Sequence, residues 1–198
     1  VIFTGTYVPP HNSPDFYALQ AGNYILGGGS FNSRLMREIR TIRGLAYYAY
    51  SRNIFQKKTG YFASGAGTRI DKVSESLSLM LEIIGGMKAP VKEQELDLAR
   101  ESIINSLVFQ FDNPEDILDN EIRFINHGMP ENYLKMFPEK INALSREQIS
   151  KAFQKHIKTD SMHIAVAGPA SLKAELETIR PVIVIKPEDT SIPGAAEN

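Results

Sequence analysis

Two strand-like segments lie close together in the middle of the chain, at residues 47–55 and 60–67. Lys57-Lys58-Thr59-Gly60 lies at their junction, and such a short link ending in glycine is typical of a β-hairpin. Strands joined this closely must run antiparallel, because a parallel pair needs a crossover of about a dozen residues or more. This hairpin constrains the fold more strongly than any other part of the sequence.

Three further strands are predicted around the hairpin. Residues 1–8 are rich in β-branched and aromatic side chains and end at Pro9-Pro10. Residues 162–167 alternate only weakly between apolar and polar side chains, so we expect a strand that is central or buried on both faces. Residues 182–185 form the last predicted strand.

The remaining segments have helical spacing or helix-capping residues. Helices are predicted at residues 14–26, 30–43, 70–84, 92–111, 115–126, 131–137, 145–156 and 171–178. The predicted N-terminal caps are Ser13, Ser30, Thr68 with Asp71, and Ser145 with Gln148. Gly44 is the predicted stop of the second helix. A hairpin beside segregated helices predicts an α+β fold with helices packed on one face of a largely antiparallel sheet.

We expect one domain over residues 1–186 and a disordered tail over residues 187–198. The tail is rich in Pro, Glu, Asp, Ser, Gly and Ala. The net charge of −1 favours neither nucleic acid nor an anionic membrane as a partner. No apolar run reaches the about 18–20 residues that a membrane helix needs. The chain has no cysteine, which excludes disulfides and thiolate metal sites. Since it opens abruptly within a strand, without a signal peptide, we expect that it was cut from a longer precursor.

The glycine run Gly27-Gly28-Gly29 precedes a predicted helix, and a helix N-terminus after glycines can bind an anion. This run follows a helix instead of a strand, however, and no Gly-Lys-Ser/Thr comes after it. A nucleotide-binding module is therefore the weaker interpretation. We favour glycines that let the two flanking helices turn sharply and pack closely.

The predicted helix at 30–43 has an apolar arc and a cationic face. The arc is formed by Phe31, Leu35, Ile39 and Ile42, with Met36 at its edge. Arg34 and Arg37 lie opposite and are expected in solvent. Arg40 lies at the border, where its stem can pack on the core while its guanidinium binds a carbonyl or carboxylate. A solvated row of cations without a function is the alternative.

One segment resembles a family signature, Gly-Gly-Gly-x-x-x-Ser-Arg-Leu-x-x-Glu-x-Arg-x-x-x-Gly-Leu-Ala-Tyr. In this chain the signature is formed by Gly27, Gly28, Gly29, Ser33, Arg34, Leu35, Glu38, Arg40, Gly44, Leu45, Ala46 and Tyr47. It is similar to the signature of the C-terminal, non-catalytic half of insulinase/pitrilysin zinc metallopeptidases, which include bacterial zinc proteases and processing peptidases. Weaker similarity extends from Val1 to about Gly168.

The resemblance implies two homologous α+β domains or subunits around a closed chamber, one of which carries the zinc motif H-x-x-E-H. His11, His127, His156 and His163 do not have that spacing, and we expect all four to be surface or cap residues. The resemblance therefore implies no metal site and no cofactor in this chain. It places Zn²⁺ in a catalytic partner half, from the same precursor or a separate subunit.

The resemblance also implies that Arg40 and Tyr47 reach across the chamber to a peptide substrate. Arg40 would bind a substrate carbonyl or carboxylate, and the Tyr47 hydroxyl would donate to the oxygen that gains charge. Strand alternation puts Tyr48 and Tyr50 on one face and Tyr47 with Ala49 on the other, so either Tyr47 or Tyr48 could face the chamber.

Two functions follow from the resemblance: the substrate-binding half of a zinc metalloendopeptidase, or a catalytically inert scaffold domain of the same family. Glu93, Glu95 and Glu101 lack a histidine or carboxylate partner and are expected on a solvated helix face. The expected compartment is the bacterial periplasm or cytoplasm, with the periplasm slightly favoured.

Overall fold

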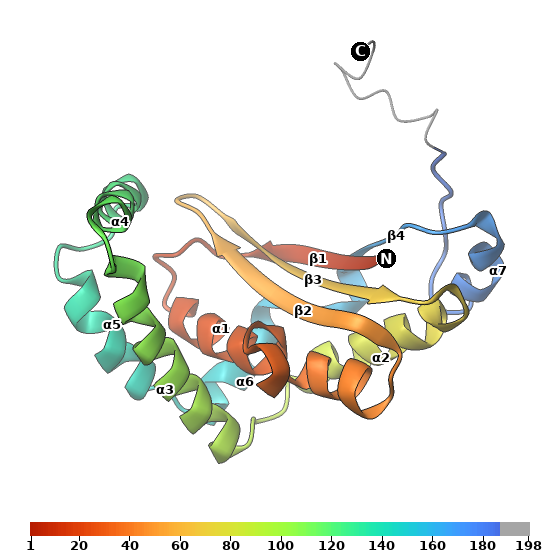
Figure 1. The fold of residues 1–198 in the computed structure, drawn as a ribbon, viewed down its shortest axis with the longest axis horizontal. Helices are drawn as coiled ribbons and strands as arrows, with labels where there is room; N and C mark the ends of the chain where they lie inside the picture. The colour runs from red at the N-terminus through yellow and green to blue at the C-terminus, as the bar shows by residue number, and fades with distance from the viewer. Residues whose placement is uncertain (187–198) are drawn as a thin grey trace, which may run out of the picture.

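The computed structural model describes residues 1–186 and contains one antiparallel sheet with helices against it (Figure 1). The strands are β1 (Ile2–Val8), β2 (Ala46–Phe55), β3 (Gly60–Thr68) and β4 (His163–Val166), in the order β2-β3-β1-β4. The hairpin forms as predicted, and all three neighbouring pairs are antiparallel. The α+β class is therefore confirmed. The tail predicted at 187–198 lies outside the described residues.

Most of the longer helices lie on one side of the sheet in Figure 1, beneath it in that view, whereas α4 (Pro114–His127) lies beside the hairpin tip. The α-helices are α1 (Phe16–Asn23), α2 (Val73–Gly86), α3 (Glu93–Val108), α4 (Pro114–His127), α5 (Tyr133–Asn142), α6 (Arg146–His156) and α7 (Lys173–Leu176). Two π-helical segments are η1 (Tyr24–Gly28) and η3 (Met36–Ile42). Short 3-10 turns are η2 (Ser30–Asn32), η4 (Ile70–Lys72), η5 (Phe109–Phe111), η6 (Thr159–Ser161) and η7 (Ala170–Leu172).

The core lies between the sheet and this helical layer. Ile2 and Phe62 from the sheet and Leu19, Met80 and Phe153 from the helices are fully buried. They belong to one continuous cluster of apolar side chains. Burial of each such side chain contributes about 1.5–3 kcal/mol, so this cluster explains why the helices stay on the covered face.

The strand predicted at 162–167 is shorter than expected, and it lies at an edge of the sheet instead of in its centre. Among residues 1–186 β4 pairs only with β1, and its exposed His163 and Ala165 alternate with the half-buried Ile164 and Val166. The strand predicted at 182–185 does not form. Its β-branched side chains favour a strand, but no backbone hydrogen bond joins it to a neighbour among residues 1–186.

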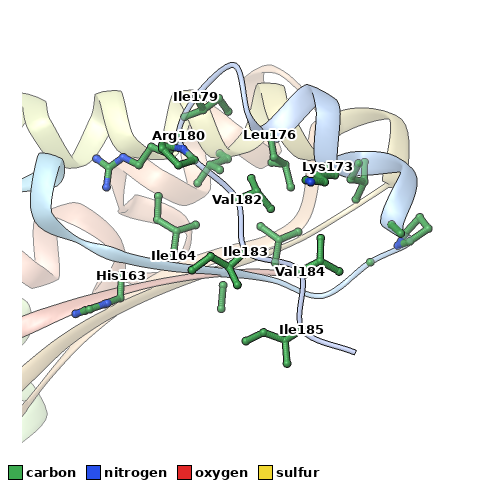
Figure 2. Close-up of a pocket in the computed structure, with 18 of the residues that line it drawn as sticks. His163, Ile164, Lys173, Leu176, Ile179, Arg180, Val182, Ile183, Val184 and Ile185 are labelled. Atoms are coloured by element: carbon green, nitrogen blue, oxygen red, sulfur yellow. The ribbon is translucent and has the colours of Figure 1, made fainter. Parts of the chain in front are cut away.

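Residues 179–185 instead pass beside β4 and α7 as an irregular segment (Figure 2). A cavity of about 630 Å³ lies between these elements, and its wall is mainly aliphatic. Residues 182–185 line this cavity, but Ile183 is 88% exposed, Val184 46% and Ile185 69%.

Three of the four predicted helix caps, Ser13, Ser30 and Thr68, differ from the structure. Ser145 and Gln148 form the predicted capping box at the start of α6. Thr68 does not cap α2, because it is the last residue of β3 and its hydroxyl donates to the Leu45 carbonyl at 2.6 Å. Ser13 is not the cap of α1 either, since Asp15 holds that position, although the Ser13 hydroxyl accepts from the Asp15 N–H.

Candidate functional site

The glycine run lets the chain between α1 and η3 approach β2 closely. A Cβ on Gly27 would lie 2.2 Å from the Ser51 backbone nitrogen, so only glycine fits against the strand there. The Ser51 hydroxyl donates to Asn23 Oδ1 at 2.8 Å in the same buried contact. Close packing is thus the role that the geometry gives Gly27, although the neighbour is a strand and not a second helix as predicted.

The second helix begins three residues later than predicted. Ser30 lies in a 3-10 turn and has a positive φ of 52°, and the hydroxyl of the buried Ser33 donates to its carbonyl at 2.6 Å. Helical backbone starts at Arg34 and becomes π-helical from Met36 to Ile42. Ser30 is therefore not the cap of this helix, because the left-handed turn at Ser30 separates it from the helix start.

The π-helical backbone changes which side chains of the helix are buried. Leu35 and Ile39 are fully buried as predicted, but Phe31 is 65% exposed and Ile42 is 62% exposed. Phe31 lies in the turn before the helix, and a π-helix advances each residue by a smaller angle than the α-helix assumed in the prediction. The helix ends at Gly44 as predicted, with φ of 61° and its N–H bonded to the Arg40 carbonyl.

Arg34 is not solvated, contrary to the prediction. Its Nε donates to Glu95 Oε1 at 2.8 Å and its Nη2 donates to Glu95 Oε2 at 2.6 Å, with both side chains mostly buried. The prediction of a solvated Glu95 is wrong for the same reason. Burial raises the pKa of the Glu95 carboxyl, but hydrogen bonds from Arg34 and the Lys92 N–H outweigh it, so the pKa is lowered overall. Glu93 and Glu101 are exposed as predicted.

Arg40 is exposed near the C-terminal end of η3. Its guanidinium carbon lies 5.1 Å from the centroid of the Phe31 ring, and its Nη1 lies 4.0 Å from Met36 Sδ. A cation over an aromatic face is attracted by the ring quadrupole. Within residues 1–186 no carboxylate pairs with Arg40, so its planar fork stays open to a ligand.

Tyr47 is exposed because β2 contains a bulge. Ala46 pairs with Thr68 and Tyr48 pairs with Gly67, so Tyr47 is one extra residue with no partner on β3. Ala46 and Ala49 both face the core, three residues apart. Strict alternation predicts Tyr47 on the buried side with Ala49, whereas Tyr47 is 72% exposed.

Tyr48 lies on the face that the helices leave open. A Cβ on Gly67 would lie 2.4 Å from Tyr48 Cε1, so the Tyr48 ring lies directly over that glycine. Tyr50 covers Gly65 in the same way. Tyr48 and Tyr50 thus share one face, as predicted. Tyr47 is the most exposed of the three tyrosines.

The four histidines do not form a metal site in the described part of the chain. His11 is only 5% exposed, which corrects its prediction as a surface residue, and it stacks on His127 with ring centroids 5.0 Å apart. His156 Nε2 lies 2.7 Å from Asp15 Oδ2, and His163 is exposed on β4. Across residues 1–186, no group of three or more His, Asp or Glu side chains could hold a metal ion.

No described helix is both long enough and apolar enough to cross a membrane.

One feature of the strands is absent from the predictions made from the sequence. β1, β2, β3 and β4 contain no aspartate or glutamate, while aromatic residues recur in β1, β2 and β3. A count of the acidic and aromatic residues in the predicted strands would have indicated this composition.

Comparison with known sequences gives the same family as the signature. Residues 2–103 match the family model of the peptidase M16 inactive domain. A Helicobacter pylori protein described as the non-peptidase homolog YmxG is 29% identical over 147 residues, covering 73% of this chain and 34% of that protein. A Rickettsia bellii protein described as an uncharacterized zinc protease is 30% identical over 152 residues, covering 75% of this chain and 36% of that protein. The chain thus spans about a third of the length of these curated relatives.

Comparison with solved structures gives the same family as the sequence comparison. The peptidase M16 inactive domain from Pseudomonas fluorescens superposes with a TM-score of 0.76 at 30% identity, covering 82% of this chain and 39% of that one. The inactive peptidase domain of a Bordetella parapertussis zinc protease has the same fold, with a TM-score of 0.66 at 18% identity, covering 83% of this chain and 89% of that one. The resemblance to insulinase/pitrilysin metallopeptidases is confirmed by these matches. The chain therefore belongs to the peptidase M16 inactive domains, the C-terminal domains of zinc-protease-like proteins.

Proposed function

We propose that this chain is the substrate-binding, non-zinc-binding half of a zinc metalloendopeptidase, and that it completes a closed chamber opposite an H-x-x-E-H half. The observation that carries the proposal is the bulge in β2, which exposes the Tyr47 phenol close in sequence to the unpaired Arg40 guanidinium. Neither side chain is needed for the core. Both the exposed phenol and the unpaired guanidinium are available to hydrogen-bond a ligand.

The two side chains suit different parts of a peptide-cleavage reaction. The Arg40 guanidinium offers several N–H donors in a fixed plane, which matches a substrate carbonyl or C-terminal carboxylate. The Tyr47 hydroxyl can donate one hydrogen bond to an oxygen on which negative charge develops. Stacking on Phe31 limits the rotamers of Arg40, and this reduces the entropy lost when it binds substrate.

Zinc does not fit the residues described in this chain, since they contain no group of three or more candidate ligands. A zinc ion would therefore be held by a homologous partner domain or subunit. The relatives described as zinc proteases are nearly three times as long as the matched region, which leaves room in those proteins for such a domain.

The test is peptide cleavage by the full-length protein with Arg40→Ala and with Tyr47→Phe. Loss of one donor to a developing charge costs about 10²–10³ in turnover, and we expect losses of that order with zinc content unchanged. Arg37→Ala is the matched control, because Arg37 is exposed on the same helix and, in the described part of the chain, forms an ion pair only with Glu38. Wild-type turnover in both Arg40→Ala and Tyr47→Phe would remove the proposed role.

One observation favours a second function, a scaffold domain without a part in catalysis. The Helicobacter pylori relative is described as a non-peptidase homolog. Under this alternative, the purified full-length protein would contain no stoichiometric zinc and would cleave no peptide. Metal analysis of that protein separates the two functions before any variant is made.

A further inference from the structure

Most of the longer helices cover one face of the sheet, and no helix is drawn over the other face, although α4 lies beside the hairpin tip (Figure 1). Strand register defines what lies on this open face, because residues directly opposite one another point to the same side. One row across the sheet is Tyr50, Gly65 and Phe3, and the row on the hairpin side of it is Arg52, Ala63, Gly5 and His163. A third row is Ile54, Tyr61 and Tyr7.

The first and third rows contain aromatic side chains, and they lie on either side of the row that contains Arg52. The Tyr50 ring covers Gly65, and Phe3, Tyr61 and Tyr7 are exposed, with Tyr7 at 75%. In the row between them, the central positions are occupied by the small residues Ala63 and Gly5. Arg52 lies in the same row on β2, an outer strand of the sheet. Aromatic rings supply large contact area at a small cost in side-chain entropy, so the two outer rows are suited to apolar side chains.

The Lys, Arg, Asp and Glu side chains within the strands have one sign of charge. None of the four strands contains Asp or Glu, and Arg52 is exposed. Arg43 precedes β2, and Lys57 and Lys58 follow it. In the part of the chain that the structure describes, these four cations make no ion pair, whereas Arg34, Arg37, Arg69 and Arg100 all do. Acidic side chains approach this face at the hairpin end, where Asp116 and Asp119 of α4 line a pocket together with Ile54. Along the strands themselves, the unpaired Arg52 without a carboxylate in any strand favours an acidic ligand.

We propose that the open face binds extended acidic peptide segments in which one carboxylate lies between two apolar side chains. This inference rests on the proposed function and names the substrate class for the same half of the enzyme. Alternate residues of a strand repeat about every 6.8 Å, and an extended peptide has the same repeat. A peptide lying along the strands therefore places aromatic, acidic and aromatic side chains over the rows of Tyr50, Arg52 and Ile54.

A peptide fits this face better than a nucleic acid does. Nucleic-acid binding depends on many cations along a phosphate backbone, and Arg52 is the only Lys or Arg within the strands. Single-stranded DNA is nevertheless included in the test, because aromatic rings can stack on bases.

The experiment measures fluorescence anisotropy with labelled peptides and the purified protein. The probe repeats Tyr-Ser-Glu-Ser-Tyr, and the pattern control repeats Tyr-Glu-Ser-Ser-Tyr with identical composition. A third peptide has lysine in place of each glutamate. We expect the probe to bind more tightly than both others, with the lysine peptide weakest.

Arg52→Glu should weaken binding of the probe by about tenfold or more, as expected for loss of one charge-assisted hydrogen bond. Tyr7→Ser should weaken it by about threefold to tenfold. Lys151→Glu is the matched control, because it makes the same change in net charge at an exposed position of α6, and it should leave affinity within about twofold. Circular dichroism and thermal unfolding of each variant exclude misfolding.

The inference is rejected if the lysine peptide binds as tightly as the probe, if Lys151→Glu weakens binding as much as Arg52→Glu, or if oligo-dT binds more tightly than the probe. Absence of binding to every peptide also rejects it. These measurements need neither zinc nor turnover. Arg40-dependent turnover without probe binding would therefore reject this inference alone, and probe binding with Arg40-independent turnover would reject only the proposed function.

Discussion

Arg34 and Glu95 are 61 positions apart and are joined by two hydrogen bonds, of 2.8 and 2.6 Å, between guanidinium and carboxylate. The same carboxylate accepts the Lys92 N–H at 2.9 Å and so closes the first turn of α3. One side chain therefore fixes both the start of α3 and its attachment to the helix that carries Arg40. Arg34 is thus a structural member of the signature, whereas Arg40 has no ion-pair partner in the described residues.

Glu95→Gln should destabilise the protein by about 1–3 kcal/mol near neutral pH, because Arg34 then loses its charged partner while mostly buried. The folded-state pKa of Glu95 is lowered. Its contribution is therefore present above the unfolded pKa of about 4.3 and is lost as pH falls through the lower, folded value. Chemical denaturation at about pH 7 and about pH 3 should show the difference between wild type and variant shrinking on acidification. A difference that grows at low pH would contradict this assignment.

Gly27→Ala should destabilise the protein by about 1–3 kcal/mol or more, because the new methyl group meets the backbone of Ser51 and not a movable side chain. Gly86→Ala is the control, since a Cβ there has no atom within 4 Å. Alanine near the end of α2 should be neutral or stabilise by up to about 1 kcal/mol. Urea unfolding of both variants gives the comparison, and equal stabilities would refute the close-packing role of Gly27.

Deletion of Tyr47 should leave the fold intact, because Ala46 and Tyr48 already face consecutive residues of β3. We expect the free energy of unfolding to change by about 1–2 kcal/mol, since no core side chain is moved. Deletion of Tyr50 should instead unfold the domain, because a one-residue slip turns every following side chain of β2 to the opposite face. Two-dimensional NMR spectra of the two deletions would decide this. A dispersed spectrum for the Tyr50 deletion would be the unexpected result.

Acidification should loosen the contact between His11 and His127. The pKa of His127 is lowered first by burial and then by the positive charges of His11, Arg123 and Lys57. A base whose folded-state pKa is lowered loses stability as pH falls below its unfolded value, here about 6.5. The unfolding temperature should therefore decrease between about pH 7 and about pH 5.5, and it should decrease less in His127→Gln. Identical decreases would place the acid sensitivity elsewhere in the chain.

Local signals in the sequence were sufficient for much of the fold. The Lys57–Gly60 link predicted the hairpin, and Ser145 with Gln148 predicted the start of α6, because both depend on neighbours within a few residues. The edge position of β4 could not be predicted in this way. It depends on which strand pairs with β1, and that choice is made between segments more than a hundred residues apart.

The errors within the site have the same origin. A strict period of 3.6 residues put Ile42 on the buried arc, whereas the π-helical turn exposes it. A strict period of 2.0 put Tyr47 on the same face as Ala49, whereas the bulge leaves Ala49 buried and Tyr47 exposed. The burial of His11 and the partner of Arg34 depend on long-range packing that spacing does not encode. The roles of Arg40 and Tyr47 in substrate binding stay predictions.

The bulge separates two requirements that a regular strand would force on the same positions. Ala46 and Ala49 can be selected for how they fill the interior, while the residue between Ala46 and Tyr48 is free of that demand. Related proteins could therefore exchange the side chain at position 47 and alter what they recognise without having to rebuild the interior around it. Proteins that have lost peptide cleavage should show this freedom first, with position 47 drifting while the two alanine positions stay small.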